Sequence, residues 1–364
     1  MSTRAGAWPG RLVVVRLGVV LLGVLATLLV AGPAVAHVGG GAAGSDFDGR
    51  VTSVSPAPSG VSVRVLEFGD ALEVVNETGT ELTVPGYTDE PYLRIGPDGV
   101  WRNALSPATY LNLDRYGLTR VPDDVDVTAP PRWEQVSTEP AYVWHDHRTH
   151  WMTEDLLPPT VAADPTRAHT VAEWTVPMAY GGTPLTVSGV LTWSPPPPAW
   201  LVWPVYALLL GATVLAGWRA RTPRPLGFAL GLGALAALAH ALTTPEPPVT
   251  VGSWPGALVS ALLPALLAVL VAAIGVRAAL RGRGVLAGLM AVVAGWLLLV
   301  QGLPDVDVLW TAHTLTRGPE LLGRATVAVL VAVGLGLVIG GALAARRFRD
   351  DAVSRRPSVE PVAA

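Results

Sequence analysis

The chain has 364 residues, of which 51% are hydrophobic and 15% are charged, with a formal net charge of −3. A soluble domain carries about 25% charged residues, so this composition excludes a fully soluble protein and a disordered one. The chain contains no cysteine, and all 25 basic residues are arginines. These two absences exclude a disulfide framework, a zinc finger, a thiol nucleophile and every lysine-dependent phosphate site.

Charge is divided unevenly along the chain. Residues 37–197 hold 9 Arg against 21 Asp and Glu, whereas the remainder holds 16 Arg against 7 acidic residues. The sequence therefore predicts an acidic module joined to a basic, apolar one. An acidic module does not suit nucleic acid, and no phosphate-cradling motif points to a nucleotide, so neither is expected as a partner.

The first 36 residues have the three parts of an export signal. Three arginines precede the apolar run 17–31, and the segment Gly-Pro-Ala-Val-Ala that follows has small residues at the −3 and −1 positions. We predict a signal peptide at 1–36, with cleavage after Ala36 leaving His37 as the first residue. The alternative is an uncleaved signal anchor.

The next segment has the pattern of a β-protein. Short runs of Val, Thr, Leu and aromatic residues are separated by turn-forming Gly, Pro, Asn and Asp. The clearest runs are 61–66, 72–76, 82–84, 141–144, 170–176 and 185–193. We predict an all-β extracytoplasmic sandwich of immunoglobulin or cupredoxin type over 37–194. The proline run 195–198 then forms a stiff linker.

The second half predicts an all-α transmembrane bundle of five helices over 199–345, followed by a cytoplasmic tail at 346–364. Each apolar run is close to the ~20 residues that cross a bilayer. Arginines cluster after the first, third and fifth runs, so the positive-inside rule puts the tail in the cytoplasm and the sandwich outside. The expected location is the cell membrane, with the lipid bilayer as a partner. The predicted runs are 199–218, 225–242, 256–276, 285–303 and 325–345.

Three histidines lie in the eleven residues Tyr-Val-Trp-His-Asp-His-Arg-Thr-His-Trp-Met, at 142–152. On an extended strand His145 and His147 point to the same face, and His150 can join them if the strand ends and turns. Imidazole nitrogens bind copper, zinc and nickel, and the thioether of the neighbouring methionine favours Cu(I). We predict a metal site, with copper as the cofactor, at these three histidines. The amine and imidazole of a mature His37 complete the set as a histidine brace.

The same cluster can instead be a hydrogen-bonded corner that binds no metal. His145 then pairs with Asp146 or Arg148, beneath the flanking tryptophans. Other chemistry is poorly supported: neither a G-x-S-x-G elbow nor an HExxH motif occurs. We therefore expect no enzyme activity.

The end of the exported module resembles copper-resistance proteins of the CopC type, some of which are fused to CopD-like membrane domains. The resemblance rests on the predicted cut before His37 and on the stretch from Glu173 to Trp193, where a tryptophan strand leads through a loop to a glycine-marked last strand. That family places an Asp-x-His copper pair in this loop. Here the loop 180–184 reads Tyr-Gly-Gly-Thr-Pro, and the nearest substitute is the His145 to His147 segment.

The middle of the module looks like a group of uncharacterised actinobacterial membrane proteins, a resemblance that implies no function. The sequence predicts extracytoplasmic copper binding in delivery, uptake or resistance, with copper-handling proteins as partners. One alternative is a membrane-anchored interaction or sensor module whose histidines are structural. Another is a channel or carrier subunit, for which the spans offer few polar groups beyond His240 and Gln301.

Overall fold

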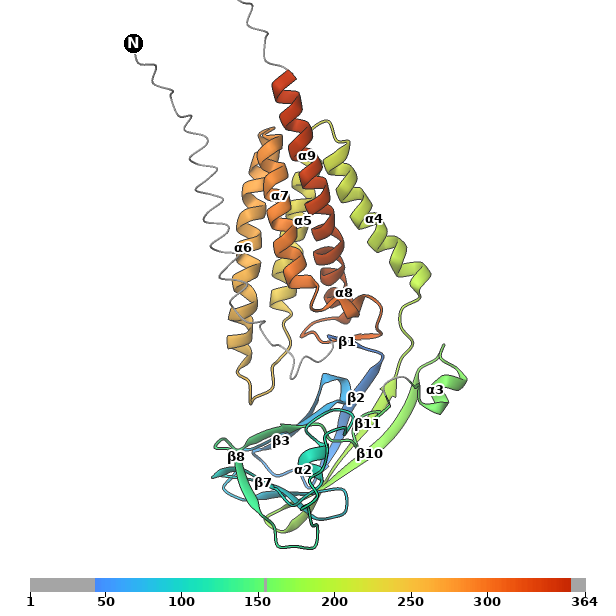
Figure 1. The fold of residues 1–364 in the computed structure, drawn as a ribbon, viewed down its shortest axis with the longest axis vertical. Helices are drawn as coiled ribbons and strands as arrows, with labels where there is room; N and C mark the ends of the chain where they lie inside the picture. The colour runs from blue at the N-terminus through green and yellow to red at the C-terminus, as the bar shows by residue number, and fades with distance from the viewer. Residues whose placement is uncertain (1–42, 154–155, 355–364) are drawn as a thin grey trace, which may run out of the picture.

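The computed structural model describes residues 43–153 and 156–354, so the predicted signal peptide and His37 lie outside the described residues. A β-sheet domain is followed by helices, and this confirms the mixed fold class (Figure 1). The strands are β1 Gly44–Ser45, β2 Phe47–Ser55, β3 Val61–Leu66, β4 Ala71–Asn76, β5 Leu82–Pro85, β6 Pro91–Gly96, β7 Gly99–Asn103, β8 Trp133–Ser137, β9 Ala141–Trp144, β10 His169–Tyr180, β11 Thr183–Trp193 and β12 His313–Thr314.

Two antiparallel sheets form the sandwich. The larger has seven strands in the order β2-β11-β10-β5-β6-β7-β8, and the smaller has the order β3-β4-β9. Every second residue of β11 from Leu185 to Trp193 is buried, as a strand with one inward face requires. Residues of both sheets form one apolar core, which includes Leu72 and Trp144 from the smaller sheet and Val176 from the larger one. Short helical segments lie at η2 Glu67–Gly69, α2 Ala108–Leu111 and α3 Pro159–Ala163.

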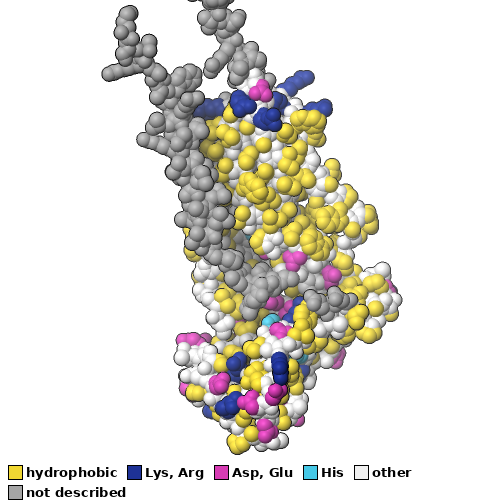
Figure 2. Space-filling view, in the orientation of Figure 1, with side chains coloured by type: hydrophobic (Ala, Val, Ile, Leu, Met, Phe, Trp, Pro, Cys, Tyr) yellow, Lys and Arg dark blue, Asp and Glu magenta, His cyan; other side chains and the backbone are white. Residues whose placement is uncertain are grey.

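Five helices of the described chain are long and apolar enough to cross a membrane, as expected of a multi-pass protein in a lipid bilayer. The fifth span, Glu320–Asp350, is interrupted by one π-helical segment. Arginines gather at the end of the bundle that faces away from the sandwich (Figure 2). The helices are α4 Ala199–Trp218, α5 Arg224–Leu242, α6 Trp254–Leu280, α7 Gly284–Gly302, the short η3 Val306–Leu309, α8 Glu320–Ala328, the π-helical η4 Val329–Val333 and α9 Gly334–Ser354.

The sandwich is attached to the bundle at its first strand. β1 pairs with β12, in the loop before the fifth span, through Gly44 opposite Thr314 and Ser45 opposite His313. The Gly44 amide also donates to Asp307 Oδ2 at 3.0 Å. Strand pairing thus holds together residues that are far apart in the chain, in addition to the covalent link before α4.

A second attachment joins β4 to the loop between α5 and α6. Glu73, 2% exposed, accepts a hydrogen bond from Arg64 Nε and another, at 2.7 Å, from the backbone amide of Val249. Arg64 Nη2 in turn donates to the carbonyl of Pro247 at 2.8 Å. One buried carboxylate therefore fixes both a side chain of the sandwich and the backbone of a membrane loop.

Replacing Glu73 with alanine is expected to release this loop. A hydrogen bond to a charged group contributes about 1.5–3 kcal/mol, so the Val249 amide should exchange its hydrogen roughly 10- to 100-fold faster in the variant. Hydrogen exchange of the full chain, followed by mass spectrometry, measures this rate. Glu134→Ala, at an exposed position on β8, is the matched control. Equal exchange in both variants would show that Glu73 does not hold the loop.

Candidate functional site

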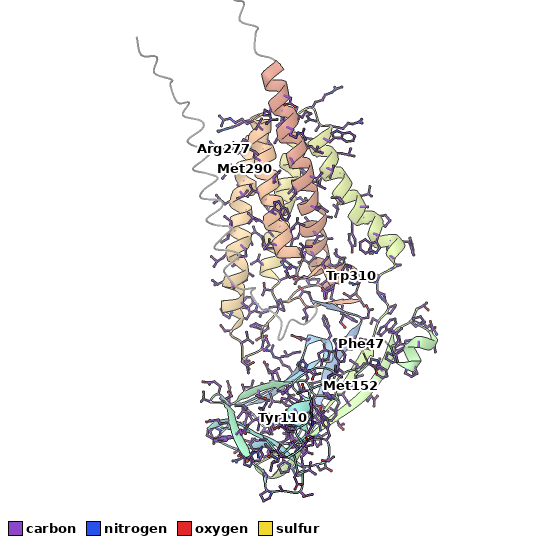
Figure 3. All side chains as sticks on the ribbon, viewed as in Figure 1. Phe47, Tyr110, Met152, Arg277, Met290 and Trp310 are labelled. Atoms are coloured by element: carbon purple, nitrogen blue, oxygen red, sulfur yellow. The ribbon has the colours of Figure 1, made fainter. Side chains whose placement is uncertain are left out.

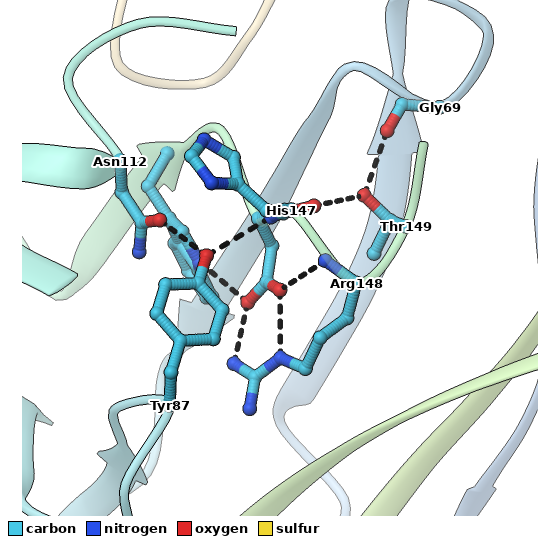
Figure 4. A network of polar contacts seen from close by, with 8 residues as sticks. Gly69, Tyr87, Asn112, His147, Arg148 and Thr149 are labelled. Atoms are coloured by element: carbon cyan, nitrogen blue, oxygen red, sulfur yellow. Dashed lines mark hydrogen bonds and ion pairs between the residues drawn. The ribbon is translucent and has the colours of Figure 1, made fainter. Parts of the chain in front are cut away.

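The histidine cluster lies where β9 ends and the chain turns. Asp146, the first fully buried residue after the strand, shapes this turn. Its Oδ1 accepts the Arg148 amide at 3.1 Å, and its carbonyl accepts the Thr149 amide at 2.9 Å. The Thr149 hydroxyl then donates to the carbonyl of Gly69 at 2.7 Å (Figure 4). An aspartate that bonds the backbone two residues ahead is a typical turn former, and here it redirects the chain toward η2.

The Asp146 carboxylate is also half of a buried ion pair. Arg148 reaches it through Nε at 2.7 Å and Nη2 at 2.6 Å, and the indole N–H of Trp144 donates to it at 2.9 Å. Burial alone would raise the pKa of Asp146, but the hydrogen bonds and charge of Arg148 outweigh burial and lower it. The arginine lies over the ring of Tyr87, 5.2 Å from its centroid. Asp146 and Arg148 therefore hold the turn together.

Each histidine of the cluster uses one ring nitrogen on a backbone carbonyl. Nδ1 of His145 lies 2.9 Å from the carbonyl of Asp70, Nε2 of His147 lies 3.1 Å from that of Asp114, and Nε2 of His150 lies 2.7 Å from that of Arg115. A carbonyl can only accept, so in each ring this nitrogen carries the proton. The other nitrogen of each neutral ring is then left with a lone pair.

Two of the three rings are in contact. Those of His147 and His150 are 5.6 Å apart between centroids and almost perpendicular, and Tyr87 stacks on His147 at 5.8 Å. His150 is 7% exposed, and its Nδ1 is buried without a hydrogen-bond partner. Burial, with the charges of Arg115 and the other two histidines as smaller causes, lowers the pKa of His150 to about 4. Burial is also the main cause that lowers the pKa of His145.

Acid is expected to destabilise the fold through His150. Its pKa is about 4 in the folded chain and about 6.5 in the unfolded one, so the unfolded state binds the proton more tightly. The stability that this difference contributes is complete above pH 6.5 and is lost as the pH falls toward 4. Between pH 6.5 and 4.5 the wild type should lose about 2 kcal/mol more than His150→Gln, which keeps an N–H for the Arg115 carbonyl. Denaturant unfolding with chelator present measures this, and parallel pH profiles would contradict it.

The other histidines of the described chain, and Met152, are not part of this cluster. His169 Nε2 bonds the carbonyl of Asp164 at 2.7 Å, in the loop before β10. His240 lies 3.3 Å from Asp305, and His313 lies 3.1 Å from Glu320, both at the end of the bundle near the sandwich. Met152 follows the cluster on the surface of the sandwich (Figure 3). Within residues 43–153 and 156–354, no three His, Asp or Glu side chains are already arranged to hold a metal ion.

The loop that covers the histidines was not recognised in the sequence. Asp114 begins it and accepts the amides of Leu118 and Thr119 at 3.0 and 2.8 Å. Gly117 has a positive φ of 65°, and a Cβ there would lie 2.7 Å from Cε1 of His147. The Asp-Arg-Tyr-Gly sequence is a turn signal that could have marked this loop, but its contact with the histidines is tertiary.

Trp174 on β10 pairs with Gly189 on β11, and its indole occupies the space that a side chain at this glycine would need. These are the strands on which the resemblance to the CopC type rests. Comparison of the chain with protein-family models, with curated proteins and with solved structures finds no match, so that resemblance stays a prediction.

Proposed function

We propose that the exported sandwich binds a metal ion, copper by preference, at His145, His147 and His150. The observation that supports this most is the pairing of one nitrogen in each ring with a backbone carbonyl. Histidines that bind metals commonly donate their other N–H in this way, which fixes the tautomer and directs the lone pair of the free nitrogen. The buried, unpartnered Nδ1 of His150 is one such lone pair. Metal binding would bring the three rings closer together.

The proposed role is extracytoplasmic copper handling, in delivery, uptake or resistance, without catalysis. The arginine-rich end of the bundle would face the cytoplasm and the sandwich the outside, in agreement with the positive-inside rule. After removal of residues 1–36, the amine and imidazole of His37 would add two nitrogens to the site. Copper-handling proteins are the proposed partners.

Copper titration of the full chain in detergent tests the proposal. The whole chain is needed because β1 pairs with β12 across the two halves. Calorimetry and Cu(II) electron paramagnetic resonance should give one equivalent with nitrogen hyperfine structure, lost in the triple alanine variant of the three cluster histidines. His169→Ala, outside the cluster, should bind as the wild type does. Absence of Cu(II), Cu(I) and Zn(II) binding by the folded chain would overturn the proposal.

The second candidate is an interaction or sensor module that binds no metal. It is favoured by the docking of the sandwich on the bundle through β1 and Glu73, which could pass a change in one part to the other. The positive charge of Arg115 beside two of the rings also opposes a cation. Failure of all three metals to bind, together with an intact fold, would select this candidate.

A further inference from the structure

A groove runs between α5 and α6 at the end of the bundle that is far from the sandwich. It is open to the surface of the bundle and has a volume of about 410 Å³. Small side chains produce it: Gly231 and Ala234 on α5 face Ala272 and Ala273 on α6. A Cβ added at Gly231 would meet no atom within 4 Å, so the space beside this residue is open. The groove lies within two apolar spans, where lipid chains are the surrounding solvent.

Two arginines line one end of the groove. Arg277 and Arg281 lie four residues apart at the end of α6, so they share one face, and both are exposed. Figure 3 marks Arg277 at the end of α6 that is remote from the sandwich. The residues that line the groove include these two cations and no acidic side chain. The groove is therefore apolar along its length and positive at its end.

We propose that this groove binds an anionic phospholipid. One acyl chain would lie along Gly231 and Ala272, and the phosphate would sit between the guanidinium groups of Arg277 and Arg281. Basic pockets between membrane helices suit anionic head groups, because the arginine planes supply several donors to phosphate oxygens. This site is independent of the proposed metal site in position and in chemistry.

Native mass spectrometry of the full chain tests the proposal, with phosphatidylglycerol and phosphatidylcholine as the two probe lipids. The wild type should retain phosphatidylglycerol in preference to phosphatidylcholine. Removing one arginine near a head group weakens anionic lipid binding by about fivefold, so R277A/R281A should remove the preference. R283A is the matched control, since Arg283 lies in the same connection but does not line the groove.

A second variant tests the acyl-chain part of the groove. Gly231→Leu should occupy the groove, since a Cβ there meets no atom within 4 Å, and should reduce retention of both lipids while leaving the arginines intact. A melting temperature equal to that of the wild type would show that the variant folds. The proposal is overturned if the wild type retains both lipids equally, if R283A acts as strongly as R277A/R281A, or if a folded Gly231→Leu variant retains lipid unchanged.

Discussion

Asp146→Asn is expected to destabilise the sandwich by about 3–5 kcal/mol, because it leaves the largely buried guanidinium of Arg148 without its counter-charge. Asp146 is fully buried and Arg148 is 21% exposed at its side chain. Denaturant unfolding followed by tryptophan fluorescence measures the loss, since the Trp144 indole donates to this carboxylate.

Two further variants test whether burial of the ion pair is the cause of this loss of stability. Asp123→Asn breaks an exposed ion pair with Arg120 and should leave the free energy of unfolding unchanged. The side chains of Arg120 and Asp123 are 83% and 88% exposed. The double variant D146N/R148M removes both buried charges but keeps an oxygen acceptor at position 146, so it should be more stable than D146N. A double variant less stable than the single one would show that the ion pair acts through other contacts.

Gly341→Leu should lower the free energy of unfolding of the bundle by more than about 3 kcal/mol, because the backbones of α7 and α9 touch at this point. A Cβ at Gly341 would lie 2.7 Å from the carbonyl of Gly288, and one at Gly288 would lie 2.6 Å from the carbonyl of Gly341. Four added carbons have no space unless the helices separate, and overpacking alone costs about 1–3 kcal/mol.

Thermal unfolding of the chain in detergent measures this effect. Gly211→Leu on α4 is the control, since a Cβ there meets no atom within 4 Å. Its melting temperature should be close to that of the wild type. If Gly341→Leu and Gly211→Leu have the same melting temperature, the close approach of α7 and α9 does not determine the stability of the bundle.

The sequence was sufficient for the elements with a simple local pattern. The apolar runs gave all five spanning helices of the described chain, and the alternating runs at 61–66 and 72–76 are β3 and β4. The other strands were not singled out, namely β1, β2, β6, β7, β8 and β12. Gly49 is the one buried residue of β2, and β8 has none, so no apolar period marks these two strands. The π-helical η4 inside the fifth span was also unforeseen, since it depends on how α9 packs.

For the candidate site, the spacing of the histidines was informative and their partners were not. Closeness of His147 and His150 follows from a turn within a few residues, which Asp146 produces. The carbonyls that receive their N–H groups come from Asp114 and Arg115, more than 30 residues earlier. Only the folded sandwich brings that loop over the histidines.

The pairing of β1 with β12 changes what a protease could release. Among the described residues, the linker at 195–198 is the single covalent connection between the sandwich and the helices, so a cut there would ordinarily free the sandwich. With Gly44 and Ser45 held by the loop before the fifth span, and Glu73 held by the loop after α5, the severed part would stay bound to its helices. The nicked protein would migrate as two fragments under denaturing conditions and as one particle under native ones.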